Sequence, residues 1–229
     1  MAWHEGPLAA FDLEATGVDP HTAHIIEVGL IRSEADGSST PLVSRLINPG
    51  VPIPTEVTQL TGISADDLAE SGGDPREVLA ETRAAIGSLV DEGVPIVVYN
   101  APYDWPLLTA ELARHGLDPL PGVPPAILID PLVLDRHVDR YRKGKRTLGT
   151  VADHYGVRLD DAHRAAGDAA ATVDVARAIG RKYAKIRIAG VELVTLQIKA
   201  HAEWRDSLNE YLAKVNPSRR PITEGWPTG

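Results

Sequence analysis

The chain has 229 residues, 43% of them hydrophobic and none of them cysteine, and its formal net charge is −9. This length suffices for a domain with its own core, and the lack of cysteine excludes disulfides, thiolate metal sites and a cysteine nucleophile. No apolar run approaches the ~18 residues of a membrane span, and no basic region precedes an apolar stretch at the N-terminus, so we expect a cytoplasmic protein with no membrane partner.

Three strands are predicted within the first 50 residues. Apolar residues over 7–13 indicate a buried strand, residues 24–31 a second and residues 42–47 a third. Asp36-Gly37 is a turn signal between the last two strands. We therefore expect these two strands to form an antiparallel hairpin.

Helices and strands alternate after residue 60. Ser64 and Asp67 have the spacing of a helix N-cap, and apolar periodicity over 75–90 predicts the next helix. The apolar run 95–99 predicts an interior strand. The further predicted elements are a helix over 102–115, a strand over 126–129 and helices over 131–138, 147–155 and 164–183. Together they predict an α/β domain with a mixed sheet over residues 1–183.

Residues 184–229 form a C-terminal extension of different character. Apolar side chains recur there at helical spacing on one face, namely Trp204, Leu208, Tyr211, Leu212 and Val215. This helix either packs back on the domain or docks a partner. We expect residues 190–229 to be dispensable for the chemistry of the domain.

Asp12 and Glu14 lie two residues apart at the end of the first predicted strand. Residues i and i+2 of a strand share a face, so the two carboxylates repel each other at short range. A hard divalent cation such as Mg²⁺ or Mn²⁺ relieves that repulsion, although a solvated strand end is the alternative. Thr16-Gly17 then turns the chain, and a glycine there lets a ligand approach the backbone.

Three later residues, Asp104, His163 and Asp168, extend this candidate site. Asp104 falls in the first turn of the helix over 102–115, where the helix dipole alone also favours an acidic residue. His163 and Asp168 would face different ways on one helix, so they converge only if His163 lies on the preceding loop. A histidine placed there can accept a proton near neutral pH.

Taken in order, these motifs resemble those of the DEDDh 3′–5′ exonucleases, a family that includes the proofreading epsilon subunit of bacterial DNA polymerase III. The motifs are FDLEATG at 11–17, NAPYD at 100–104 and HRAAGD at 163–168, with INPG at 47–50 and LTGI at 60–63 between them. Tyr99 and Tyr103 depart from the family, in which His and Phe are common at these positions. The resemblance covers about residues 7–183 and implies a ribonuclease H-like fold, with a five-stranded mixed sheet whose second strand is antiparallel and with helices flanking it.

The resemblance also implies a two-metal site. Asp12, Glu14 and Asp168 would bind one Mg²⁺ or Mn²⁺ ion, Asp12 and Asp104 would hold a second, and His163 would act as the general base. The substrate contacts that it implies are Thr16, Gly17, Leu60, Thr61, Asn100 and Tyr103. The expected reaction releases nucleoside 5′-monophosphates from a 3′ end.

The resemblance favours single-stranded DNA as substrate, in proofreading, repair or phage replication, with a polymerase or other replication partner at residues 184–229. An exoribonuclease of the RNase T or oligoribonuclease type is the alternative, because recognition of the 2′-hydroxyl depends on pocket shape. A nucleic-acid-binding module without catalysis is a third possibility. The basic cluster over 136–146 either follows the phosphate backbone or forms a solvated loop face.

Overall fold

The computed structural model describes residues 2–159 and 163–227. Its strands form one mixed sheet in the order β3-β2-β1-β4-β5. The strands are β1 (Leu8–Ala15), β2 (Ile25–Ser33), β3 (Ser39–Leu46), β4 (Ile96–Val97) and β5 (Leu128–Ile129). β2 pairs antiparallel with β1 and β3, whereas β4 and β5 run parallel to β1. The predicted α/β fold is confirmed, including the single antiparallel position of the second strand.

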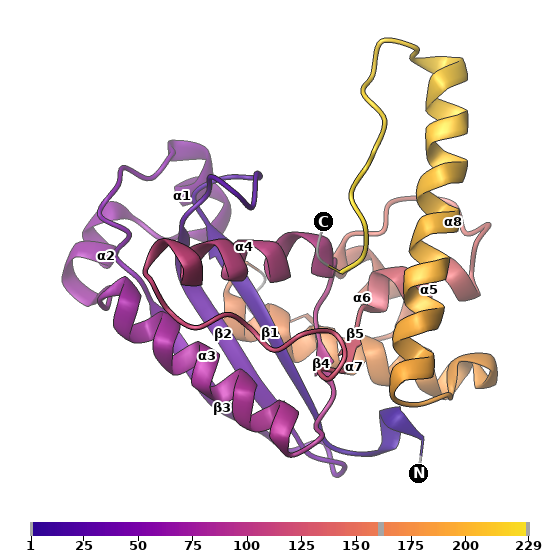
Figure 1. Cartoon of the computed structure of the whole chain (residues 1–229), viewed down its shortest axis with the longest axis horizontal. Coiled ribbons are helices and arrows are strands. Elements are labelled where there is room, and N and C mark those ends of the chain that lie inside the picture. The colour runs from indigo at the N-terminus through magenta and orange to yellow at the C-terminus, as the bar shows by residue number, and fades with distance from the viewer. Residues whose placement is uncertain (1, 160–162, 228–229) are drawn as a thin grey trace.

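Helices cover both faces of this sheet, with α3 and α4 in front and α7 behind it in Figure 1. The helices are α1 (Thr55–Thr61), α2 (Ala65–Ser71), α3 (Pro75–Asp91), α4 (Ala101–Arg114), α5 (Pro131–Val138), α6 (Leu148–Tyr155), α7 (Ala165–Lys182) and α8 (Val191–Val215), with 3-10 turns η1 (Trp3–Glu5) and η2 (Ala184–Ile186). Within the described ranges, no helix is both long and apolar enough to cross a bilayer.

The alternation of side chains along β1 separates the two cores. Phe11 and Leu13 belong to the core beneath α3 and α4, whereas Leu8 and Ala10 belong to the core shared with α7. The period of two continues to the end of the strand, so Asp12 and Glu14 lie on the α7 face. Asp12 and Glu14 therefore lie at the carboxyl end of β1, where α7 begins.

Most predicted elements are present, with Ser64 capping α2 through Asp67 as expected. The prediction missed α1, whose seven residues are too short for a helical period to stand out. The available signal was Gly62, which ends α1 in the left-handed conformation at φ 72°. β4 and β5 are shorter than predicted, but β4 is an interior strand, between β1 and β5.

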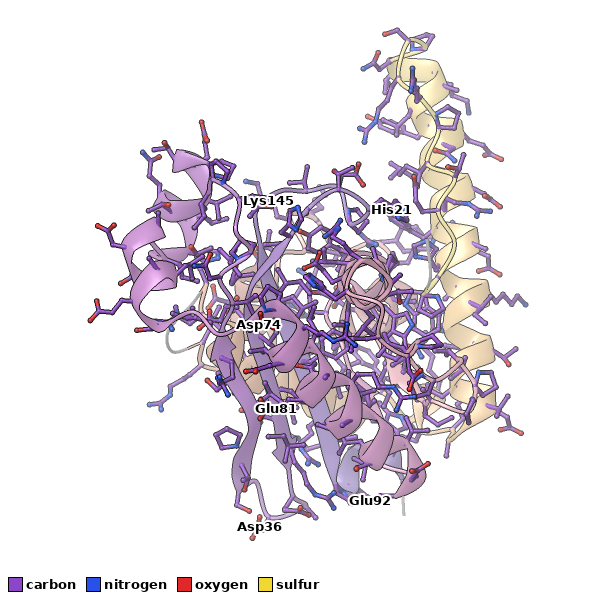
Figure 2. All side chains as sticks on the ribbon, turned by 60° about the vertical axis from the view of Figure 1, so that its left-hand side comes forward. His21, Asp36, Asp74, Glu81, Glu92 and Lys145 are labelled. Carbon is purple, nitrogen blue, oxygen red and sulfur yellow. The ribbon has the colours of Figure 1, made fainter. Side chains whose placement is uncertain are left out.

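The first turns of α8 are part of the core. Leu193, Val194 and Gln197 are essentially inaccessible to solvent, and α8 lies against α5 and β5. Its last turns project beyond the sheet and the helices packed on it in two views (Figures 1 and 2), and Tyr211 is 58% exposed. The chain then returns beside α8 and buries Trp226. These contacts argue against the expectation that residues 190–229 are dispensable, whereas their docking of a partner stays a prediction.

A buried carboxylate, Asp130, joins the extension to the rest of the fold. It accepts hydrogen bonds from five N–H groups, those of Asn100 N (3.1 Å), Ala101 N (3.0 Å), Leu132 N (2.9 Å), Val133 N (3.4 Å) and Trp226 Nε1 (3.1 Å). Its own N–H donates to the side-chain oxygen of Gln197 at 2.7 Å. One residue thus holds the start of α4, the start of α5, α8 and the C-terminal segment together.

Trp226→Ala should lower the free energy of unfolding by about 3–5 kcal/mol, because it leaves a cavity beneath the C-terminal segment. Trp226→Phe should cost less, since it keeps most of the packing and removes one hydrogen bond to Asp130. Urea denaturation followed by circular dichroism measures both. An unchanged midpoint for Trp226→Ala would show that the C-terminal segment is not part of the core in solution.

Candidate active site

The two carboxylates at the end of β1 face the first turn of α7. In the antiparallel pairing of β1 with β2, Asp12 lies opposite Gly29 and Glu14 lies opposite Glu27. Each of these partners on β2 has a distinct part in bringing α7 to the pair.

Gly29 lets α7 lie directly on the sheet. A Cβ atom at this position would overlap the peptide bond between Ala165 and Ala166 in the first turn of α7. Backbone cannot move aside as a flexible side chain can, so only glycine permits this approach. The contact brings Asp168, also in the first turn of α7, to Asp12 and Glu14.

Glu27 fixes the same helix end by hydrogen bonds. Its buried carboxylate accepts from the Ala165 N–H at 3.0 Å and pairs with the Arg164 guanidinium at 2.7 Å. Arg164 is the N-cap of α7 but makes no side-chain cap bond of its own, so Glu27 provides the capping oxygen from a neighbouring strand. The residue next to Arg164 in the chain is His163, whose place therefore depends on this contact.

His163 lies on the loop before α7, as the spacing required. Its backbone has φ 65°, a left-handed conformation that only Asn100 shares among the described residues other than glycine. The His163 N–H donates to Asp168 Oδ2 at 3.3 Å. One potential ligand atom from each of Glu14, His163 and Asp168 lies within 4.8 Å of the other two.

Asp104 completes the cluster from the opposite side of the sheet. It is buried in the first turn of α4, whose N-terminal amides at Asn100 and Ala101 are held by Asp130. Burial raises the pKa of Asp104 well above its usual range, against the opposing effect of a hydrogen bond from the Leu13 backbone. We call Asp12, Glu14, Asp104 and Asp168 the acidic cluster.

Burial and mutual repulsion keep these carboxyl groups from ionising freely. Burial, followed by repulsion from Asp104 and Asp168, raises the pKa of Asp12 well above its usual range. Burial and the charge of Asp168 raise the pKa of Glu14 to about 7, although Arg164 opposes the shift. Burial also raises the pKa of Asp168. The site therefore carries more negative charge than its own cations compensate.

This arrangement fits a divalent cation. Asp168 Oδ1 is buried and has no hydrogen-bond partner, so an acceptor is available to a ligand at that point. The rest of the donor set consists of carboxylate oxygens, which hard cations prefer. Glu14 and Asp168 bring potential ligand atoms together with His163, and Asp12 and Asp104 are two further carboxylates that could hold a metal.

The turn after β1 combines structural and exposed groups. Thr16 Oγ1 accepts from the His24 N–H at 2.9 Å, and the Tyr103 hydroxyl donates to the Gly17 carbonyl. Neither a positive φ nor a close neighbour demands glycine at 17, where a Cβ would meet only Ala23 at 3.9 Å. The space over the Gly17 backbone is therefore open to a ligand.

Three further predicted substrate contacts, Leu60, Thr61 and Asn100, differ in how free their side chains are. Leu60 is 58% exposed, so it is not a core residue. Thr61 is buried, and its hydroxyl donates to the Val57 carbonyl and accepts from the Ile63 N–H. Asn100 is the N-cap of α4, but its side chain makes no capping bond there. Leu60 and Asn100 are therefore the freer of the three to meet a ligand.

Sequence reasoning missed Gly29, Glu27 and Asp130. Glu27 had a signal, since it is one carboxylate within the apolar run of residues 25–31, where a charge needs a partner. Asp130 also had one, because it precedes Pro131 as an N-cap residue does. Gly29 had none, because its need appears only when α7 is placed on β2.

Carboxylates from β1, α4 and α7 lie beside a histidine on a mixed sheet of the ribonuclease H-like fold, which is the fold class of this protein. Residues 9–176 match the RNase T exonuclease family, and the chain belongs to that family. Its fold and motifs place it among the DEDDh 3′–5′ exonucleases.

Relatives and solved structures agree with this assignment. DNA polymerase III PolC-type of Caldanaerobacter subterraneus subsp. tengcongensis is 29% identical over 75% of the chain, and that of Clostridium perfringens is 31% identical over 72%. The chain spans only 11% and 10% of those two proteins. An exonuclease I structure superposes with a TM-score of 0.67 at 18% identity, over 80% of this chain and 42% of the other. Exonuclease I from Methylocaldum szegediense gives a TM-score of 0.66 at 22% identity, over 80% and 42%.

Gly29→Ala should reduce kcat/KM for a nucleic acid substrate by roughly 100-fold or more, because it pushes the start of α7 off the sheet and displaces Asp168. Steady-state kinetics and thermal unfolding measure the effect. The matched control is Gly87→Ala on α3, where the new methyl meets only the flexible Arg83 side chain and helix propensity improves. Equal activity of the two variants would contradict the role of Gly29.

The acidic cluster should make the apoprotein less stable as pH rises. Folded Glu14, with a pKa of about 7, binds its proton more tightly than the unfolded residue at 4.5, so its contribution is fully present below pH 4.5 and is lost as pH rises towards 7. In EDTA at pH 8, Asp12→Asn should therefore raise Tm by at least about 2 °C. Differential scanning fluorimetry measures this shift.

Mn²⁺ or Mg²⁺ should raise the Tm of the wild-type chain more at pH 8 than at pH 6, and should raise that of Asp12→Asn little. The exposed Asp118→Asn substitution is the control and should behave as wild type. A lower Tm for Asp12→Asn in EDTA at pH 8 would show that the carboxylates are not in net repulsion.

Proposed function

We propose that this protein is a metal-dependent 3′–5′ exonuclease that removes nucleoside 5′-monophosphates from single-stranded DNA ends. The observation that carries the proposal is the convergence of the acidic cluster and His163 at one edge of the sheet. All five positions expected from the DEDDh pattern are filled by the residue types that the chemistry needs.

Asp12, Glu14 and Asp168 would hold one Mg²⁺ or Mn²⁺ ion, and Asp12 with Asp104 a second. When bound, such ions stabilise negative charge on the attacking and leaving oxygens of a phosphoryl transfer. The carboxylates fix that site because β1, α4 and α7 hold them from three directions. Burial raises their pKa values, so metal binding has to displace protons at neutral pH.

His163 would accept, on an imidazole nitrogen, the proton that the attacking water loses. The water oxygen forms a bond to phosphorus as the bond to the 3′ oxygen of the preceding nucleotide breaks. That 3′ oxygen takes a proton from solvent, which leaves a 3′-hydroxyl on the shortened strand. His163 is exposed and lies on a loop, so its side chain can reach a bound substrate. The hydrogen bond from its backbone N–H to Asp168 keeps the loop at the site.

The terminal nucleotide would lie between the turn after β1 and the end of α1. Thr16, Gly17 and Asn100 would contact its sugar and phosphate, and the exposed Leu60 would pack on the base. Tyr103 would act indirectly, since its hydroxyl already holds the Gly17 carbonyl. Thr61 would act through the shape of the α1 end.

DNA is favoured over RNA by the relatives, which are DNA polymerases, and by exonuclease I structures that contain dT13 and dA16 oligonucleotides. The same relatives favour a role in proofreading or repair, with a replication partner at residues 184–229. An exoribonuclease of the RNase T or oligoribonuclease type uses the same acidic cluster, so it remains the second candidate.

A 5′-labelled single-stranded DNA should shorten from its 3′ end in the presence of Mg²⁺ or Mn²⁺ and stay intact in EDTA. Asp12→Ala should abolish the ladder because it removes a ligand of both metals, and His163→Ala should slow it by about 100-fold or more. Denaturing gel electrophoresis follows the time course. An RNA of the same sequence run in parallel measures the substrate preference.

Asp118→Ala and His115→Ala, both away from the acidic cluster, serve as matched controls and should cleave as wild type does. Faster decay of the RNA would replace DNA with RNA as the substrate. Folded, metal-loaded protein that degrades neither strand would favour a binding module instead.

A further inference from the structure

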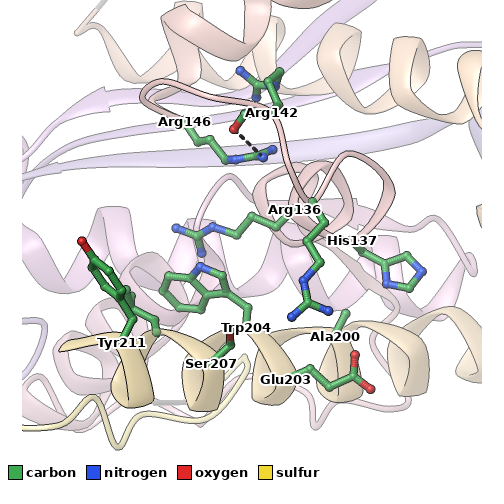
Figure 3. A pocket seen from close by; sticks show the side chains of 11 residues that line it. Arg136, His137, Arg142, Arg146, Ala200, Glu203, Trp204, Ser207 and Tyr211 are labelled. Atoms are coloured by element: carbon green, nitrogen blue, oxygen red, sulfur yellow. Dashed lines mark hydrogen bonds between the residues drawn. The ribbon is translucent and has the colours of Figure 1, made fainter. Parts of the chain in front are cut away.

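A second site of opposite charge lies between the basic cluster and α8 (Figure 3). This pocket has a volume of about 430 Å³. We call it the arginine pocket; its lining comprises Arg136, His137, Arg140, Arg142 and Arg146 on one side and Ala200, Glu203, Trp204, Ser207, Leu208 and Tyr211 of α8 on the other. It shares no lining residue with the acidic cluster.

Three of the arginines build the wall of this pocket. Arg142 and Arg146 both form ion pairs with the buried Asp135, the first at 2.6 Å. The guanidinium of Arg136 lies 3.6 Å from the centre of the Trp204 ring, a cation–π contact between α5 and α8. These contacts fix the pocket and one aromatic face within it.

Other cations of residues 136–146 are not used by the fold, and among them Arg140 lines the pocket. Arg140, Lys143 and Lys145 are exposed, and across the described ranges no carboxylate pairs with them. Residues 136–146 contain six Lys or Arg and a single Asp, in a chain whose net charge is −9. Like charges that lie together without partners repel one another, and an anionic ligand bound there would relieve that repulsion.

Aromatic side chains accompany these cations. Tyr211 lines the pocket and is 58% exposed, and Tyr141, on the basic segment itself, is 89% exposed. Exposed large aromatic rings beside free cations are the combination that binds single-stranded nucleic acid, since bases stack on the rings while phosphates meet the cations.

A hydrogen bond joins the basic segment, residues 136–146, to the residue that precedes the N-cap of α4. The Tyr99 hydroxyl donates to the Arg146 carbonyl at 2.7 Å. Tyr99 directly precedes Asn100, the N-cap of the helix that carries Asp104. One end of the basic segment is thus fixed beside the start of α4.

We propose that the arginine pocket, with the cations of residues 140–145, binds the single strand upstream of the 3′ end that is being cut. This inference rests on the proposed exonuclease function and extends it to a second contact region. An acidic protein segment would satisfy the charges, but the exposed tyrosines and the link to the start of α4 favour a nucleic acid strand.

Binding and cleavage should respond differently to the loss of these cations. In EDTA, the triple variant Arg140→Ala/Lys143→Ala/Lys145→Ala should bind a fluorescent dT20 at least about tenfold more weakly by anisotropy. The slope of log K against log salt concentration should also fall by about 2, from ~0.7 for each lost phosphate contact. With Mn²⁺, its kcat/KM for dT4 should stay within about twofold of wild type, because a short strand needs only the catalytic edge.

Tyr211→Ala should weaken dT20 binding by about fivefold, whereas Tyr211→Phe should retain it, because stacking needs the ring and not the hydroxyl. The charge control is Arg32→Ala/Arg76→Ala/Arg83→Ala, on β2 and α3 and away from α8 (Figure 1), which should bind dT20 as wild type does.

Unchanged dT20 binding by the pocket triple variant would overturn the proposal and leave an acidic protein segment as the ligand. An equal loss with both triple variants, or an equal loss of kcat/KM on dT4 and dT20, would also overturn it. If the wild-type chain cleaves nothing but loses dT20 binding only through the pocket substitutions, the pocket stands and the exonuclease proposal fails.

Discussion

The close approach of α7 to β2 is the contact on which the site depends. A helix that starts directly over a strand needs a residue without a side chain beneath it, and Gly29 provides that space. The amide groups of the helix start also need an acceptor, and Glu27 provides it from the same strand. These two residues lie opposite Asp12 and Glu14, so the contact that packs the fold also determines where Asp168 meets them.

The acidic cluster stores unfavourable electrostatic energy in the folded chain. Burial and repulsion raise the pKa values of its members, and the fold holds them together because the surrounding elements are fixed by other contacts. Asp130 is central to that support, since it holds the start of α4 and is itself bound by α8 and the C-terminal segment. The extension therefore contributes to the geometry of the site from a distance.

The distribution of charge explains how an acidic chain can act on an acidic polymer. The acidic cluster is negative, whereas residues 136–146, which are joined to the start of α4 through Tyr99, carry six cations. Arg136, Arg142 and Arg146 are used to join α5, the basic segment and α8, which leaves Arg140, Lys143 and Lys145 on the surface. Paired and exposed cations are thus separated within eleven residues.

The order of the strands along the chain, the antiparallel hairpin and the candidate site residues could be predicted from the sequence, because periodicity and motif spacing are local properties. Those residues are Asp12, Glu14, Asp104, His163 and Asp168. The short helix α1 and the extents of β4 and β5 escaped prediction, since two to seven residues hold too little periodic signal.

Three contacts became visible only in the folded chain: Gly29 lies under α7, Glu27 caps that helix and Trp226 returns to Asp130. These contacts join residues that are 96 to 138 positions apart, and no local pattern encodes such a distance. Folding also decides which arginines of residues 136–146 have partners. Asp135 and Trp204, which contact these arginines, become their neighbours only when the chain is folded.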